Sequence, residues 1–160
     1  MALNDQQFEI NVFWTGNRGF GTRDYKAYGR DHTVTAEGVP ALLGSADRKF
    51  HGDRDRWNPE QLLLTSLAQC HMLSYLHVAA SHGIVVTKYE DTATGTLTLN
   101  GDGSGQFSSA TLQPKIYVAD PATRELALSL HAEAAAKCFI ARSLNFPVHH
   151  TPGLLAATSD

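Results

Sequence analysis

Residues 58–70 have the sequence NPEQLLLTSLAQC, and this stretch predicts the first turns of a long helix. Asn58 is a favourable N-cap, Pro59 suits the first helical position, and Glu60 places negative charge in the first turn. The helix is expected to end near residue 81, because a glycine follows shortly after it. Apolar residues cover nearly every side of this helix, which indicates burial all round. A chain of 160 residues achieves such burial most easily by pairing with a second chain.

Segments on both sides of this helix alternate apolar and polar residues, which is typical of β-strands. Before the helix, strands are expected at residues 8–15, 21–27 and 32–37, followed by a long loop at residues 38–56. After it, we expect a hairpin with arms at residues 85–99 and 107–118, and then a second helix from Asp120-Pro121 to about Asn145. The order strands, helix, strands, helix indicates a single α+β domain over residues 1–160.

The charge balance excludes several classes of partner. Lys and Arg total 13 and Asp and Glu total 16, so the chain is slightly acidic, and it has no basic run that would bind nucleic acid. No apolar stretch is long enough to span a membrane, and the first residues lack the basic and apolar regions of a secretion signal. We therefore expect a cytoplasmic protein that binds neither nucleic acid nor membrane. The charged fraction of 18% is below the usual value of about 25%, which favours a surface shared with a partner chain.

The chain has two cysteines, Cys70 in the middle of the first expected helix and Cys138 near the end of the second. This number is far too small for a disulfide scaffold, and a reducing compartment disfavours a permanent structural disulfide. Two interpretations remain open: a pair of buried small hydrophobic side chains, or a reactive pair used in redox chemistry.

Reactivity would require a cation or a helix N-terminus near one of the thiols, because either favours the thiolate. The middle of the helix that carries Cys70 offers no such terminus, so a basic side chain has to come from elsewhere. Arg18 in a Gly-rich turn is one candidate, and Arg48 in the long loop before the helix is another. Arg54 and Arg56 in the same loop compete for this role.

Glu60 lies ten residues before Cys70 on the same helix. This spacing corresponds to a rise of about 15 Å, so the Glu60 carboxylate does not reach the Cys70 thiol of its own chain. Cooperation between them would require an antiparallel copy of the helix from a second subunit. The alternative is that Glu60 only stabilises the positive end of its own helix.

Several well-known catalytic motifs are absent from the sequence: HExxH, CxxC, GxSxG, a Walker A loop and GxGxxG do not occur. We therefore expect no bound metal and no nucleotide cofactor. A metal site formed by Cys70, Cys138 and one of the eight histidines is a weaker alternative, because only the tertiary structure would bring these residues together.

The stretch from Asn58 to Cys70 resembles the OsmC/Ohr family of organic hydroperoxide reductases. The family shows an Asn-Pro-Glu-Glu/Gln-Leu opening, a cysteine ten residues after the Glu, and a second cysteine on the last helix. This chain has both cysteines and a similar length and order of elements. The resemblance implies an OsmC-like fold: an intertwined homodimer in which two long central helices pack between antiparallel sheets, with active sites at the subunit interface.

The resemblance also implies roles for individual residues. Cys70 would attack the peroxide and become a sulfenic acid, and Cys138 would condense with it to a disulfide. An external dithiol of lipoyl or thioredoxin type would then reduce this disulfide, with no other cofactor. Glu60 is the matching carboxylate. The segment around Arg18 is similar to the Thr-Gly-Gly-Arg segment of the Ohr branch, whereas the OsmC branch takes its arginine from the loop before the helix, which favours Arg48.

The chain departs from the family pattern at both cysteines, since Cys70 is followed by His71 and Cys138 by Phe139. We therefore interpret it as a member of a divergent subgroup. The resemblance also implies a role in the stress response. Apolar residues suited to alkyl or lipid peroxides are expected to line the substrate pocket: Leu67, Phe139 and Phe146. Arg48 is also expected to take part in substrate binding. The alternative function is a non-catalytic stress protein that binds a small apolar ligand on the same dimeric scaffold.

Overall fold

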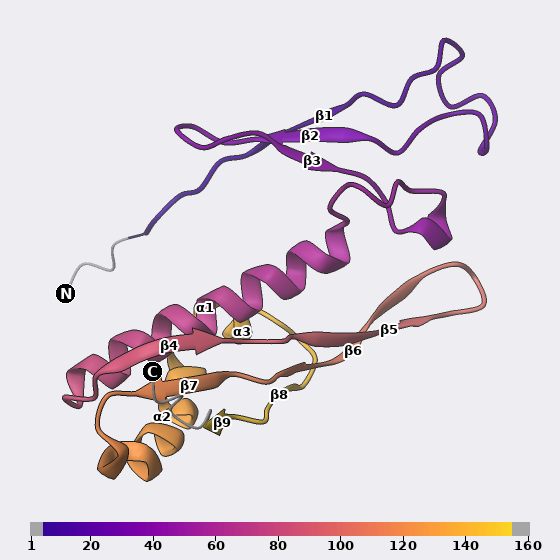
Figure 1. The fold of residues 1–160 in the computed structure, drawn as a ribbon. Coiled ribbons are helices and arrows are strands. Elements are labelled where there is room, and N and C mark those ends of the chain that lie inside the picture. The colour runs from indigo at the N-terminus through magenta and orange to yellow at the C-terminus, as the bar shows by residue number, and fades with distance from the viewer. Residues whose placement is uncertain (1–4, 155–160) are drawn as a thin grey trace. The chain divides into compact units, whose positions relative to one another are not determined.

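The structure is a computed structural model that describes residues 5–154 (Figure 1). It divides the chain into two compact units, the first ending at Leu62 and the second beginning at Leu63, and each is described by itself. The single domain expected over residues 1–160 therefore stays a prediction.

The first unit contains a three-stranded antiparallel sheet with the strand order β1-β2-β3. The strands are β1 (Asn11–Trp14), β2 (His32–Thr35) and β3 (Leu42–Gly44). The loop expected before the helix thus contains a strand, and it also contains a short 3₁₀ helix, η1 (Arg48–Phe50).

The strand predicted at residues 21–27 is wrong, because this segment folds as a series of turns. The Asn17 side chain accepts hydrogen bonds from the backbone N–H groups of Gly19 and Gly21, at 2.9 and 3.0 Å. Both glycines have positive φ, at 107° and 58°, in the region that favours glycine. The backbone N–H groups of this segment therefore bond to a nearby side chain and not to a neighbouring strand.

The long helix α1 (Pro59–Ser81) begins and ends as predicted. The Gln61 N–H donates to Asn58 Oδ1 at 2.8 Å, and the Asn58 N–H donates to Gln61 Oε1 at 3.2 Å, which is a reciprocal capping box. At the other end, Gly83 has a φ of 73°. The buried residues of α1, including Leu67, lie in one stripe, whereas Leu73 is 60% exposed. Burial on all sides is not achieved within one chain, so its completion by a partner stays a prediction.

The two long strands expected after α1 are each divided in two. The strands are β4 (Val86–Glu90), β5 (Thr94–Leu99), β6 (Gly105–Leu112) and β7 (Lys115–Val118). The breaks face each other: the Gln113 N–H donates to Asp91 Oδ1 at 2.8 Å, and Pro114, which has no N–H, follows. As a result β4 pairs with β7 in one sheet and β5 pairs with β6 in another.

Two short strands near the C-terminus complete these sheets. They are β8 (Val148–His150), parallel to β6, and β9 (Gly153–Leu154), parallel to β7. The strand orders are β4-β7-β9 and β5-β6-β8. The α+β class is confirmed, but the sheets of the second unit are mixed and not purely antiparallel.

The second helix is not continuous to residue 145, as predicted, but is broken at Cys138. It consists of a 3₁₀ turn, η2 (Pro121–Thr123), then α2 (Arg124–Lys137) and the short α3 (Phe139–Arg142). Cys138 has extended backbone angles, φ −73° and ψ 111°, and ends one helix while it begins the next. This position turns its side chain into the core.

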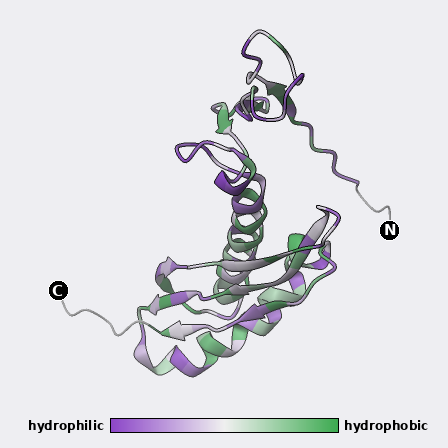
Figure 2. Cartoon of the chain, turned by 90° about the vertical axis from the view of Figure 1, so that its right-hand side faces the viewer, coloured by the Kyte–Doolittle hydropathy of each residue, from purple (hydrophilic) through white to green (hydrophobic). Residues whose placement is uncertain are grey.

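Two apolar clusters form the core of the second unit. The first joins Tyr75 and Val78 of α1 to Ile116 of β7 and Leu130 of α2, so both helices pack on the β4-β7-β9 sheet. Both helices mix hydrophobic and hydrophilic residues along their length (Figure 2). No helix among the described residues is long and apolar enough to cross a membrane.

Candidate active site

The two cysteines meet in the second apolar cluster of the second unit. Cys138 is fully buried there, and the partly buried Cys70 packs against it. Both are free thiols, and they are close enough for Cys70 to influence the pKa of Cys138. The structure thus brings together, in one apolar cluster, two residues that are far apart in the sequence.

The surroundings of Cys138 hold it as a thiol. Burial raises the pKa of Cys138 to about 11, and the neighbouring Cys70 thiol acts in the same direction. The Ala141 N–H donates to Cys138 Sγ at 3.4 Å and acts against this rise. At neutral pH Cys138 is therefore protonated and poorly nucleophilic, which suits a second rather than a first attacking group.

Alkylation should distinguish the two thiols. We expect iodoacetamide at pH 7 to modify Cys70 at least about tenfold faster than Cys138, because Cys138 is fully buried and its pKa is raised. Peptide mass spectrometry on samples quenched over time measures both rates. The protein unfolded in guanidinium is the control, where both thiols should react alike, and equal rates in the folded protein would contradict the expectation.

Arg18 already has a partner within the first unit. Its Nη2 donates to Asp31 Oδ1 at 2.7 Å, and the Asp31 side chain is largely buried. Burial acts to raise the pKa of Asp31, but the hydrogen bond from Arg18 outweighs it and leaves this pKa below its usual value. Since Arg18 and Cys70 belong to different units, the activation of Cys70 by Arg18 stays a prediction.

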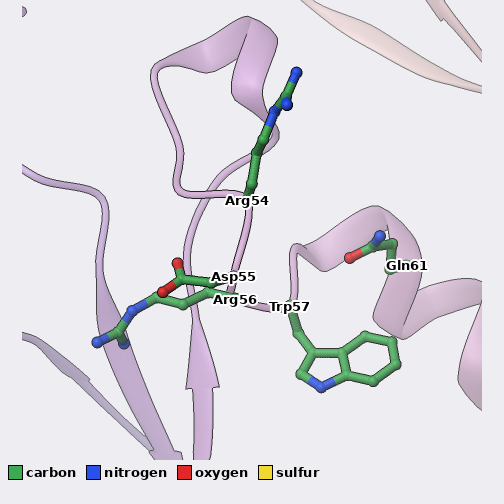
Figure 3. Close-up of a pocket in the computed structure, with 5 residues that line it drawn as sticks. All are labelled: Arg54, Asp55, Arg56, Trp57 and Gln61. Carbon is green, nitrogen blue, oxygen red and sulfur yellow. The ribbon is translucent and has the colours of Figure 1, made fainter.

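The loop arginines lie in the first unit, before and beside the start of α1. Arg48 is in η1 and is exposed. A cavity of about 280 Å³ is lined by residues from the end of the loop and the first turn of α1: Arg54, Asp55, Arg56, Trp57 and Gln61 (Figure 3). The Arg54 and Arg56 side chains extend in different directions, and Arg56 Nη1 donates to the His32 carbonyl at 3.3 Å.

Glu60 belongs to the first turn of α1, as predicted. One of its carboxylate oxygens, Oε2, is buried and has no hydrogen-bond partner among the residues that the structure describes. A buried acceptor without a partner is costly. Glu60 Oε2 can therefore accept a hydrogen bond from a group that another molecule supplies.

Two of the three expected substrate-pocket residues adjoin the thiols. Leu67 is fully buried in the same cluster as Cys138. Phe146 packs against this cluster and stacks on Phe107, with ring centroids 5.6 Å apart. Phe139 is different: its side chain is 80% exposed, and the structure does not bring it into the cluster.

A cluster of three histidines was not indicated by the sequence. His71, His131 and His150 come from α1, α2 and β8, and only the tertiary structure brings them together. Burial lowers the pKa of His71 to about 3 and that of His131 to about 4, and it also lowers the pKa of His150. Among residues 5–154, no group of three or more His, Cys, Asp or Glu is placed to hold a metal ion.

The fold and the paired thiols define the class of protein. The family model described as OsmC-like protein matches residues 51–152, which is more than half of the chain. The chain belongs to the OsmC-like family, and the resemblance found in the sequence is confirmed.

Solved structures support this assignment. An OsmC-like protein of unknown function from Vibrio cholerae is 26% identical, with a TM-score of 0.82 over 92% of this chain and 99% of that chain. An organic hydroperoxide resistance protein OsmC from Legionella pneumophila is 18% identical, with a TM-score of 0.67 over 95% of this chain and 100% of that chain. An organic hydroperoxide resistance protein from Elizabethkingia anophelis is 18% identical, with a TM-score of 0.65 over 94% of this chain and 98% of that chain. None of the curated proteins matches the sequence significantly.

Proposed function

We propose that the protein is a thiol-dependent peroxidase that reduces organic hydroperoxides. The observation that carries the proposal is the packing of the free thiols of Cys70 and Cys138 together in one apolar cluster. Two structures of the same fold belong to proteins named for organic hydroperoxide resistance, which supports this substrate class. The apolar side chains of Leu67 and Phe146 beside the thiols suit an alkyl or aryl peroxide.

The reaction proceeds in three steps. The Cys70 thiolate attacks the terminal peroxide oxygen, the O–O bond breaks, and the alcohol leaves after taking a proton, so that Cys70 becomes a sulfenic acid. The Cys138 sulfur then attacks the sulfenic sulfur, and the hydroxyl leaves as water with the Cys138 proton, which forms the disulfide. An external dithiol of lipoyl or thioredoxin type supplies two electrons and two protons and restores both thiols.

The active form is a homodimer in this proposal. All four residues of β1 are exposed within the chain, and among them Val12 is 58%, Phe13 57% and Trp14 45% exposed. A strand with large apolar side chains exposed on both faces requires a cover. A second copy of the chain would provide it, and it would also bring Glu60 and an arginine, Arg18 or Arg48, to the thiols. A cytoplasmic location would supply the dithiol reductant.

A disulfide-trapping experiment tests the proposal. The fully reduced protein is treated with one equivalent of cumene hydroperoxide, and peptides are mapped without reducing agent. We expect the Cys70–Cys138 disulfide to form, and to form faster than with hydrogen peroxide because the surroundings of the thiols are apolar. If both thiols stay reduced, peroxidase activity is excluded and the alternative of a ligand-binding stress protein is favoured.

A further inference from the structure

The histidine cluster of the second unit takes no part in the proposed thiol chemistry. His71 is 0% and His131 3% exposed, and His71 Nε2 lies 3.0 Å from His131 Nδ1. The His131 ring stacks on that of Tyr75, with centroids 4.0 Å apart, and the His150 ring lies 4.5 Å from that of His71. The rings form one packed group, in which a single imidazole–imidazole hydrogen bond joins α1 to α2.

Each histidine of the cluster retains a buried ring nitrogen without a hydrogen-bond partner among the described residues. These atoms are His71 Nδ1, His131 Nε2 and His150 Nε2. Leaving a buried donor or acceptor unpaired lowers the stability of the folded state, so such atoms call for a partner outside the chain. Two of the three residues, His131 and His150, line the same cavity.

This cavity lies within the second unit, between α2 and the segment from Val148 to Pro152. Its volume is about 780 Å³, within the range of small-molecule sites. Apolar side chains form much of its lining, among them Leu128 and Ala132 of α2. His131 is almost fully buried and still lines the cavity. Its unpaired Nε2 is itself shielded from solvent, so a ligand hydroxyl would reach this atom by displacing the side chains around it.

The residues that line the cavity favour an uncharged ligand. Among the residues that the structure describes, no Asp, Glu, Lys or Arg side chain lines the cavity. A carboxylate or an ammonium group would therefore lose water without gaining an opposite charge. Burial keeps the pKa of His131 at about 4, so its ring is neutral at pH 7.

The hydrogen bond between His71 and His131 limits which polar group of a ligand can pair with His131 Nε2. If His71 donates to His131 Nδ1, then His131 Nε2 carries a proton and donates; if His131 donates, its Nε2 accepts. A hydroxyl group both donates and accepts, so it pairs with His131 Nε2 in either case.

We propose that this cavity binds a small uncharged alcohol or phenol, with its hydroxyl on His131 Nε2 and its apolar body against Leu128 and Val148. This site is distinct from the thiol pair, and the proposal does not depend on peroxidase activity.

Binding of three matched probes tests the proposal. Benzyl alcohol, benzoate and benzylamine share one aromatic body and differ in the charge of the head group. In ¹H–¹³C NMR spectra of the reduced protein, we expect benzyl alcohol to shift the His131 and His150 ring signals saturably, and to bind at least about tenfold more tightly than the charged probes. No peroxide is present, so the result is independent of the proposed function.

Two variants of α2 provide the control. Ala132 lines the cavity and is exposed, so Ala132→Phe should fill it without disturbing the core and weaken benzyl alcohol binding at least tenfold. Ala136 is exposed one turn further along and does not line the cavity, so Ala136→Phe should bind like the parent protein. The proposal is overturned if benzyl alcohol does not bind saturably, if benzoate or benzylamine binds as tightly, or if both variants bind it equally.

Discussion

Replacing Cys70 with serine should lower the turnover of cumene hydroperoxide by roughly a thousandfold or more. A serine hydroxyl is not ionised at neutral pH, and it forms neither a sulfenic acid nor a disulfide. The substitution removes one sulfur atom from a partly buried position, so its effect on folding is small beside its effect on chemistry. Peroxide consumption in the presence of a dithiol measures the loss, and circular dichroism checks that the variant is folded.

Cys138→Ser is the matched control, because it changes the other thiol of the same apolar cluster. This variant should consume one equivalent of peroxide and then stop as the Cys70 sulfenic acid, which dimedone labels. A single turnover in Cys138→Ser and none in Cys70→Ser would show that Cys70 attacks the peroxide and that Cys138 is needed only for the later disulfide step. Retained turnover in Cys70→Ser would exclude Cys70 as the attacking residue.

The parts of the fold that could be predicted from the sequence are those encoded by neighbouring residues. The start of α1 depends on Asn58, Pro59 and Gln61, which lie within one turn of each other and form the cap directly. The same local signals, a capping Asp120 and a proline, correctly predicted a helical start near residue 120.

Two of the wrong predictions concern interruptions that depend on distant partners. The long hairpin is divided because Asp91 receives a hydrogen bond from Gln113, 22 residues away. The second helix is broken at Cys138, where the side chain turns into the core beside Cys70. No periodicity within either segment carries this information.

The residues of the candidate site likewise include some that the sequence predicted and some that it did not. Cys70 and Cys138 could be chosen from the sequence because the chain has only two cysteines, and their contact agrees with that choice. The partner of Arg18 could not be predicted, since Asp31 lies beyond a turn-rich segment. The histidine cluster combines three elements of one fold, so its members carry no common spacing.

Acidification should destabilise the protein through this histidine cluster. Burial lowers the pKa of His71 to about 3 and that of His131 to about 4, from a usual value of 6.5. Between these values and 6.5 the unfolded chain binds more protons than the folded one, so the free energy of unfolding falls as the pH falls. Between pH 7 and pH 5 each of these two histidines should remove about 2 kcal/mol, and the lowered pKa of His150 adds to the loss.

Urea unfolding at pH 7 and pH 5 measures this difference, and His131→Phe tests its origin. Phenylalanine keeps a flat ring against Tyr75 but removes one titrating group. The pH-dependent part of the loss should therefore shrink by about 2 kcal/mol, whatever the variant costs at a single pH. His77 is exposed on the same helix as His71, so His77→Phe should leave the pH dependence of the parent protein unchanged. The contrary result would be the same loss of unfolding free energy between pH 7 and pH 5 in the parent protein, His131→Phe and His77→Phe. It would mean that the buried histidines do not resist protonation in the folded state.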